Sequence, residues 1–343
     1  MRSRACRLTI VHELTTLAGG RFVVSLDFEL HWGVRAQWSV AAYRANLLGV
    51  RDVVPSLLEV FREFDIHATW ATVGMLFFGT RRELLNGLPA LRPAFGDPHL
   101  SAYSDLDEIG DAEEDDPYHY AKSLVQRIAE HRDQEIATHT FSHYFCLEHG
   151  AEVASFSDDL EAAKNAARPY DITLRSLVFP GNQAAERFVR AAAAQDLTVY
   201  RGNQSAWLYR AGPQARQQTT IRRGLRLLDA YVMLSGHNAY SPDALVTGDV
   251  VNIPASRALR PYGRTLRALE GLRRWRIETD LDYAARNDLV YHLWWHPHNF
   301  GVNLDRNLDV LRGILRRFAE LRERFGMRSV TMAELADELK GLG

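Results

Sequence analysis

Two histidines separated by three residues, His139 and His143, are the first sign of chemistry in the sequence. Imidazole and carboxylate groups are the usual protein ligands of zinc and its first-row neighbours, and a catalytic zinc takes three protein ligands and leaves one position for water. The spacing alone is weak evidence, because histidines four apart face the same side of any helix. Ile136 and Ala137, however, end an extended run, which predicts that His139 lies just beyond the carboxyl end of a strand, where barrels of alternating strands and helices assemble their active sites.

A pair of acidic residues supplies the carboxylates that such a site needs. Residues 22–26 form a short apolar run typical of a fully buried strand, and Asp27 and Glu29 follow. Side-chain alternation puts both acids on the same side if the strand continues, so one could bind metal while the other handles protons. Each acid taken alone is as simply explained by a turn cap or a solvated surface position.

A histidine-rich segment follows a third apolar run. Residues 289–295 predict a buried strand, and His296 and His298 come directly after it. Histidine gives and takes protons near neutral pH, so either of them could protonate a leaving amine. His292, inside the strand, is better explained as a core histidine with satisfied hydrogen bonds.

Taken together, these motifs resemble those of the polysaccharide deacetylases with a NodB-homology domain, also called carbohydrate esterase family 4, and the resemblance covers most of the chain. It implies an α/β fold, a distorted seven-stranded (β/α) barrel, in a single catalytic domain over residues 1–343. It also implies that Asp27 is the catalytic base and His296 the catalytic acid. The divalent metal is expected to be zinc, with cobalt or manganese as alternatives, and its implied ligands are Glu29, His139 and His143.

The third motif of the family resembles residues 178–182, and the match implies that a backbone N–H near Gly181 or Asn182 stabilises the oxyanion. In the family an arginine precedes the proline of this motif and pairs with the catalytic aspartate, whereas this chain has a valine there. We expect Arg175 or Arg201 to take its place, because both lie near predicted strand ends. A second departure is the glutamate among the metal ligands, where an aspartate is commoner, and it is expected to alter metal affinity or choice.

The activity that the resemblance implies is removal of an N-acetyl group from an amino sugar, in the metabolism of a cell-surface polysaccharide. Trp32, Arg201 and His298 are predicted to contact this carbohydrate substrate, although a tryptophan is as readily explained as a core residue. Two alternatives stay open: hydrolysis of another small amide or ureide, and a catalytically silent carbohydrate-binding protein. The retained Asp27 favours catalysis, because a pure binder needs no base beside the metal.

Charge and hydropathy limit the partners and the location. The 343 residues carry a net charge of −2, so nucleic acid is not an expected partner. No run is long enough to span a bilayer, and the N-terminus lacks the apolar core of a signal peptide, so a cytoplasmic location is expected. Cys6 and Cys146 cannot define a disulfide framework, and the oligomeric state is unknown from the sequence.

The helices and strands that position these residues are predicted most clearly by the sequence pattern near the C-terminus. Apolar residues from Leu304 to Phe318 recur at helical spacing, and Thr331 with Glu334 predicts a capping box that opens the last helix.

One segment is longer than a simple barrel connection. Between residues 203 and 276 arginines outnumber acids, which predicts a basic insertion. An apolar stripe at helical spacing beside several arginines predicts a basic amphipathic helix within it. Such a helix most simply packs against the barrel; peripheral contact with an anionic membrane or with a lipid-linked sugar is the alternative. The stripe consists of Tyr262, Leu266, Leu269, Leu272 and Trp275.

Overall fold

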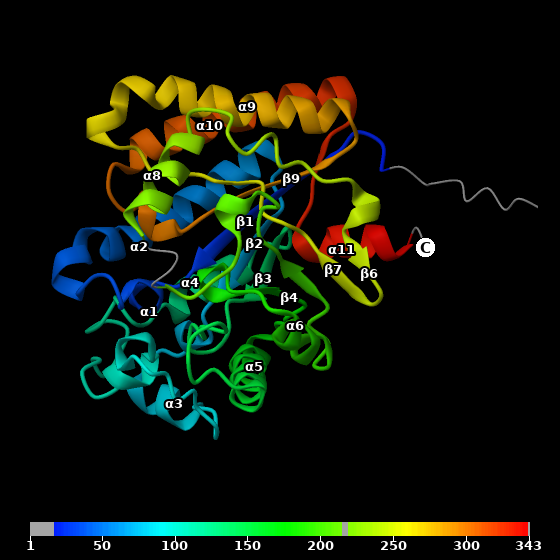
Figure 1. Ribbon diagram of the computed structural model, residues 1–343. Helices are drawn as coiled ribbons and strands as arrows, with labels where there is room; N and C mark the ends of the chain where they lie inside the picture. Colours follow the sequence, from blue (N-terminus) through cyan, green and yellow to red (C-terminus); the bar gives the residue numbers. More distant parts are fainter. Residues whose placement is uncertain (1–16, 215–218, 342–343) are drawn as a thin grey trace, which may run out of the picture.

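The computed structural model describes residues 17–214 and 219–341, in which a parallel sheet is rolled up and covered by helices (Figure 1). The strands are β1 (Arg21–Phe28), β2 (Ala68–Thr72), β3 (Gln134–Thr138), β4 (Ser176–Val178), β5 (Val199–Arg201), β6 (Val246–Thr247), β7 (Val250–Asn252), β8 (Arg257–Ala258), β9 (Val290–Trp295) and β10 (Arg328–Ser329). Six of them pair in parallel in the order β5-β4-β3-β2-β1-β9.

One extended segment closes this sheet into a barrel. β7 pairs in parallel with β5, and β8, which follows it closely, pairs in parallel with β9. Between them Ala255 N–H donates to Gly202 O and Ser256 N–H donates to His292 O, so the backbone passes from one neighbouring strand to the other. With β7 and β8 counted as one strand, the described residues form a distorted seven-stranded barrel, as predicted. β6 and β10 add short edges at β7 and β1.

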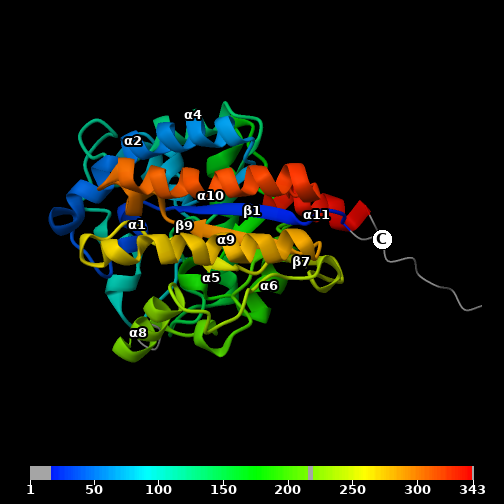
Figure 2. The ribbon, with the colours of Figure 1, turned by 90° about the horizontal axis from the view of Figure 1, so that it is seen from above.

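Helices cover the outside of the barrel. α2, α10 and α9 lie side by side over β1 and β9 (Figures 1 and 2), and no described helix is both long and apolar enough to span a membrane. The helices are α1 (His31–Val34), α2 (Val40–Phe64), α3 (Arg81–Asn86), α4 (Lys122–Ala129), α5 (Val153–Ala167), α6 (Glu186–Ala193), α8 (Thr220–Asp229), α9 (Glu270–Arg286), α10 (Leu304–Phe325) and α11 (Met332–Gly341).

The strands are buried on both faces, as in other parallel sheets. Alternate residues of β1 such as Phe22 and Leu26 pack against the helices, whereas Val23 points into a separate cluster inside the barrel. Met332 of α11 belongs to this inner cluster, so α11 closes the amino end of the barrel and leaves the carboxyl end for a site.

The predictions for the C-terminal helices are confirmed. The apolar face of α10 is buried, including Leu311 and Phe318. Thr331 and Glu334 form the predicted capping box, in which each side chain accepts the backbone N–H of the other residue, at 3.1 and 2.8 Å. Of the two cysteines, Cys146 is buried in the core and Cys6 lies outside the described residues.

The segment 203–276 contains α8 and a short β6–β7 hairpin, and also the strands that close the barrel. Its predicted amphipathic stripe does not pack against the barrel. Residues 264–269 form a 3₁₀ helix, so the α-helical spacing of the stripe is not realised there. α9 packs instead through another face, on which Ile277, Leu281 and Ala284 belong to the core. The same face buries Arg276, which pairs with Asp280 one turn further along the helix. The exposed fractions on the stripe are 39% for Leu269, 40% for Leu272 and 56% for Trp275.

Candidate active site

The strand register brings Glu29 and His139 to the same level. The last residues of β1, β2 and β3 are paired with one another across the sheet, and Glu29 and His139 are the next residues after β1 and β3. His139 N–H donates to Thr72 O over 2.9 Å, which fixes the start of its loop. Both side chains therefore emerge together at the carboxyl edge of the barrel.

Glu29, His139 and His143 form a buried cluster with the composition of a metal site. Their ligand atoms all lie within 4.8 Å of one another. The Nε2 atoms of His139 and His143 lie 3.3 and 3.1 Å from Glu29 Oε2. Each of the three residues is less than 5% exposed, so the structure brings the three predicted ligands together away from solvent.

The hydrogen bonding of His139 fits a bound cation. Its Nδ1 lies 2.8 Å from Val178 O, which can only accept, so Nδ1 carries a proton. In the neutral ring Nε2 then presents its lone pair to the Glu29 carboxylate, and two acceptors at this distance need a positive charge between them. A bond from the other ring nitrogen to a backbone carbonyl is the usual way in which proteins orient a metal-binding histidine. The donor set therefore fits a divalent metal.

The charge state of Glu29 agrees with this. Burial raises the pKa of its carboxyl group, but the charge of His296 and the close contacts with His139 and His143 outweigh burial and hold the pKa well below its usual range. Glu29 is therefore ionised at neutral pH, as a metal ligand must be.

The loop that carries the two histidines has a strained backbone held by an acid. Thr140 and His143 have φ of 63° and 57°, in the left-handed region where a β-branched residue is uncommon. Asp159 of α5 accepts the N–H of Phe141 at 2.6 Å and that of Ser142 at 3.2 Å, and it also accepts the Ser142 hydroxyl. Burial raises the pKa of Asp159 to about 6. No sequence pattern marks this supporting residue, because only the fold brings α5 to the loop.

Gly33 leaves the space that Glu29 occupies. A Cβ at this position would lie 2.0 Å from the carboxyl carbon of Glu29 and 2.3 Å from each of its oxygens. No side chain fits there unless the carboxylate moves. No sequence pattern marks this glycine, although its place four residues after the predicted metal ligand is visible in the sequence.

Asp27 has a bidentate arginine partner. Arg201 donates from Nη1 and Nη2 to the two carboxylate oxygens over 2.7 and 2.8 Å, and both residues are buried. Burial raises the pKa of Asp27, but the charge of Arg201 and then that of His139 offset it, so the pKa is lowered. Arg175 instead pairs with Asp337 at the surface. Of the two arginines expected to replace the missing motif residue, the structure thus selects Arg201.

The arginine is itself held from inside the barrel. Arg201 Nη1 donates to the Ser25 hydroxyl at 3.0 Å, and His292 Nε2 lies 2.8 Å from the same hydroxyl. The other ring nitrogen of His292 lies 3.1 Å from Ile253 O, and burial lowers the pKa of this histidine to about 3. The prediction that His292 is a hydrogen-bonded core histidine is confirmed.

His296 lies nearer to the carboxylates than His298 does. Its Nε2 is 3.7 Å from Asp27 Oδ2 and 3.5 Å from Glu29 Oε1, and its side chain is 27% exposed. His298 stacks on it with ring centroids 5.0 Å apart, is buried, and has its pKa lowered by burial to about 3. His296 is therefore better placed to exchange a proton with a substrate, while a neutral His298 lines the same pocket.

These residues surround a pocket of about 310 Å³, to which Trp38, Tyr43 and Trp294 contribute aromatic side chains. Trp32, predicted as a sugar contact, does not line it. Trp32 is 1% exposed and donates its indole N–H to His119 O over 2.8 Å, so its ring is enclosed in the core and cannot stack on a sugar. That prediction is wrong.

Gly181 and Asn182 line the pocket in a tight turn, with φ of 60° and 54°. The Asn182 N–H donates to Phe179 O over 2.9 Å within this turn, so it is not directed at a substrate oxyanion. The side-chain oxygen of Asn182 accepts instead from Arg201 at 3.1 Å. An oxyanion role for the Gly181 N–H stays a prediction.

Comparison with known proteins supports the fold. No protein-family model matches the chain, and no curated protein matches its sequence. Among solved structures, a provisionally named polysaccharide deacetylase from Mycobacterium smegmatis aligns with a TM-score of 0.59 and 13% identity over 94% of this chain and 91% of that one. A second polysaccharide deacetylase, also provisionally named, from Pseudomonas aeruginosa PAO1, aligns with a TM-score of 0.54 and 8% identity over 93% of this chain and 90% of that one.

The chain therefore has the fold of the polysaccharide deacetylases, as its motifs predicted. The fold extends to other enzymes. A GH57-type branching enzyme from the archaeon Pyrococcus horikoshii aligns with a TM-score of 0.50 and 11% identity over 95% of this chain and 71% of that one. Function must therefore be argued from the site and not from the fold.

Proposed function

We propose that this protein is a metal-dependent hydrolase that removes the N-acetyl group from an amino sugar, in the metabolism of a cell-surface polysaccharide. One observation supports this above all others: the ionised Asp27, clamped by Arg201, adjoins the buried cluster of Glu29, His139 and His143 in an open pocket. A binding protein has no use for a base in this position. The clamp also supplies the arginine partner of Asp27 that the third motif lacks.

The chemistry divides between the bound ion and the side chains. A divalent metal on Glu29 and the two histidines, zinc first and cobalt or manganese as alternatives, would supply Lewis-acid polarisation of the acetamide carbonyl and of water. Asp27 accepts the proton of the attacking water, since Arg201 keeps it ionised at neutral pH.

The second proton transfer belongs to His296. It gives a proton to the sugar nitrogen as the carbon–nitrogen bond breaks, which yields acetate and a free amine. Its partial exposure lets it reach a substrate that enters the pocket, which buried His298 does less readily. Trp294 and Trp38, on the pocket wall, are the aromatic side chains that could stack on the sugar ring.

The experiment that tests this proposal is acetate release from N-acetylglucosamine oligomers and peptidoglycan fragments by protein reconstituted with zinc, cobalt or manganese. Asp27→Asn is the matched control, because it removes the base while Glu29, His139 and His143 remain. We expect acetate from the wild type and none from the variant at equal metal content. Turnover of small cyclic amides or ureides without acetate release would contradict the substrate class, and sugar binding without any turnover would contradict catalysis.

A further inference from the structure

A second pocket adjoins the active site. It has a volume of about 220 Å³ and shares Asn182, Arg226 and Trp294 with the catalytic pocket. Pockets for drug-sized ligands hold about 300–1,000 Å³, so this one suits a single small group. Because the two pockets share walls, one molecule can place its acetamide in the first and another group in the second. The second pocket is called the arginine pocket below, and its charged lining residues are Arg226, Arg257 and Arg260.

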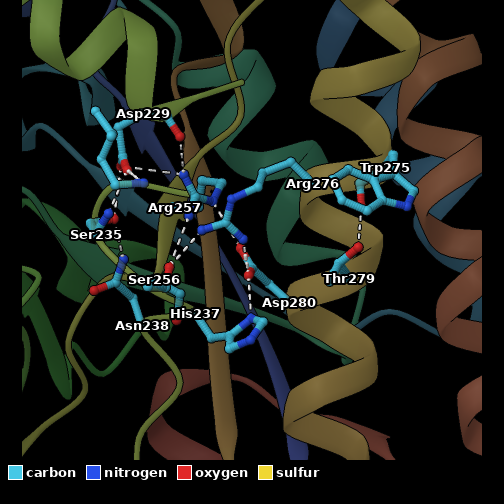
Figure 3. A network of polar contacts seen from close by, with 12 residues as sticks. Asp229, Ser235, His237, Asn238, Ser256, Arg257, Trp275, Arg276, Thr279 and Asp280 are labelled. Atoms are coloured by element: carbon cyan, nitrogen blue, oxygen red, sulfur yellow. Dashed lines mark hydrogen bonds and ion pairs between the residues drawn. The ribbon is translucent and has the colours of Figure 1, made fainter. Parts of the chain in front are cut away.

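One of the three arginines is neutralised by neighbouring acids. Arg257 donates from Nε to Asp280 over 3.0 Å, and its Nη1 contacts the backbone oxygen and the carboxylate of Asp229. Figure 3 shows Asp280 between Arg257 and Arg276, with His237 on its other side. The buried carboxylates of this region are therefore engaged by Arg257 and Arg276.

The other two arginines lie in a surplus of positive charge. Within the described part of the chain, the side chain of Arg260 makes no hydrogen bond and no ion pair, and burial together with Arg273 and Arg223 lowers its pKa. Arg226 of α8 donates to Leu208 O at 3.3 and 3.2 Å, and burial, then Arg222 and Arg260, lower its pKa. Two guanidinium groups from separate elements thus line one small pocket with no carboxylate among its lining residues.

A buried amide in the same wall also lacks a partner. Gln204 is 6% exposed, and its side-chain oxygen has no hydrogen-bond partner. The side-chain oxygen of Asn203 has none either, but its amide nitrogen donates to Asn182 O at 3.0 Å, which sets the orientation of that amide. The oxygen and nitrogen of the Gln204 amide can be exchanged by a flip, so this group can donate to, or accept from, a polar ligand. Buried polar groups normally have partners, which points to a ligand that carries oxygen atoms.

We propose that the arginine pocket binds a phosphate group joined to the amino sugar whose N-acetyl group occupies the catalytic pocket. This inference rests on the proposed function and narrows its substrate to a phosphorylated acetamido sugar. A phosphate monoester carries a charge near −2 at neutral pH, which matches the charges of Arg226 and Arg260, and arginine binds phosphate through paired hydrogen bonds. A carboxylate supplies only one charge.

The phosphate can belong to a soluble sugar phosphate or to a lipid-linked sugar. α8, which carries Arg226, exposes Ile221 by 77% and Leu228 by 47%, so apolar and basic side chains lie together beside the pocket. Both sources present the same group to the pocket, and separate arms of one experiment distinguish them.

The first arm is calorimetric binding to the zinc-loaded protein, with N-acetylglucosamine 1-phosphate and neutral N-acetylglucosamine as probes. We expect the wild type to bind the phosphorylated sugar about tenfold more tightly or better, and the advantage to shrink as salt is added. Arg260→Met removes this preference and leaves the affinity for the neutral sugar unchanged. Arg267→Met removes the same charge from an exposed position in the same segment and keeps the preference.

Equal affinity for the two probes in the wild type, or a preference that survives in Arg260→Met, would overturn the proposal. Equally tight binding of glucuronic acid and glucose 1-phosphate would overturn the specificity for phosphate. If Arg260→Met does not fold, Arg226→Met on α8 is read by the ratio of the two affinities alone, because Arg226 also lines the catalytic pocket. Binding is measured without turnover, so it tests the phosphate site separately from the deacetylase activity. A preference for the phosphorylated sugar without acetate release would contradict the deacetylase activity and support the phosphate site.

The second arm compares acetate release from N-acetylglucosamine 1-phosphate with release from a polyprenyl-diphosphate-linked N-acetylglucosamine in phosphatidylcholine vesicles. A higher kcat/KM on vesicles supports the pocket with a lipid-linked source, and a higher value in solution supports it with a soluble source. Faster deacetylation of neutral oligomers than of either phosphate compound would contradict it.

Discussion

Gly33→Ala tests the geometry of the predicted metal centre without substituting any of its ligands. The new methyl carbon would lie 2.0 Å from the Glu29 carboxyl carbon, where ordinary contacts between carbon atoms are about 3.5–4.0 Å. The carboxylate must therefore move by about 1.5 Å. Metal–ligand distances tolerate changes of only about 0.2 Å. Loss of this ligand is expected to weaken metal binding by about 100-fold or more, which corresponds to about 2.7 kcal/mol.

The assay is zinc affinity by competition with a chromophoric chelator, beside circular dichroism to verify the fold. Gly271→Ala is the matched control, because a Cβ at this position in α9 meets nothing within 4 Å. We expect wild-type affinity in Gly271→Ala and a large loss in Gly33→Ala with the fold intact. Wild-type zinc affinity in a folded Gly33→Ala protein would refute the assignment of Glu29 as a ligand in this geometry.

Three further predictions concern the arginine clamp, the catalytic acid and stability. Arg201→Met leaves the buried Asp27 charge unpaired, so we expect the free energy of unfolding, measured by urea titration, to fall by about 3–5 kcal/mol. The acid limb of the pH–rate profile should shift to higher pH, because the pKa of Asp27 rises. Arg175→Met removes a surface ion pair and should change neither quantity. His296→Gln should lower kcat by about 10²–10⁴ with metal retained. A comparable loss in His298→Gln alone would reverse the assignment of the acid. The hydrogen bond to Glu334 raises the pKa of His67, so this pair stabilises the fold below the unfolded pKa of about 6.5 and loses its effect as pH rises through the folded value. His67→Gln should therefore lower the free energy of unfolding at pH 6, relative to that at pH 9, by under about 1 kcal/mol, because both groups are partly exposed. Urea titration at the two pH values measures this, and an unchanged difference between them would contradict the assignment.

The sequence predicted those parts of the site that follow directly from strand ends. Glu29 and His139 each come after an apolar run, and parallel strands deliver their carboxyl ends to one edge, so their meeting could be anticipated. From the sequence, the expected partner of Asp27 was either Arg175 or Arg201. The choice of Arg201 depends on β5 lying next to β4 and on the alternation that turns this side chain into the barrel.

Other features depend on contacts between distant segments, which a local pattern does not contain. The sequence position of Trp32 is compatible with a sugar contact, but in the fold the loop around His119 covers its ring. Asp159 supports the histidine loop only because α5 packs beside it. The apolar stripe ending at Trp275 is not the packing face, because residues 264–269 form a 3₁₀ helix and α9 buries a different face that contains Ile277 and Leu281.

The most direct test of the metal centre is elemental analysis of purified, zinc-reconstituted protein, wild type beside His139→Ala. The donor set of Glu29, His139 and His143 predicts about one equivalent of metal in the wild type and its loss in the variant at unchanged fold. Absence of metal from the reconstituted wild type, or an equal content in the variant, would contradict the metal centre and with it the proposed hydrolysis.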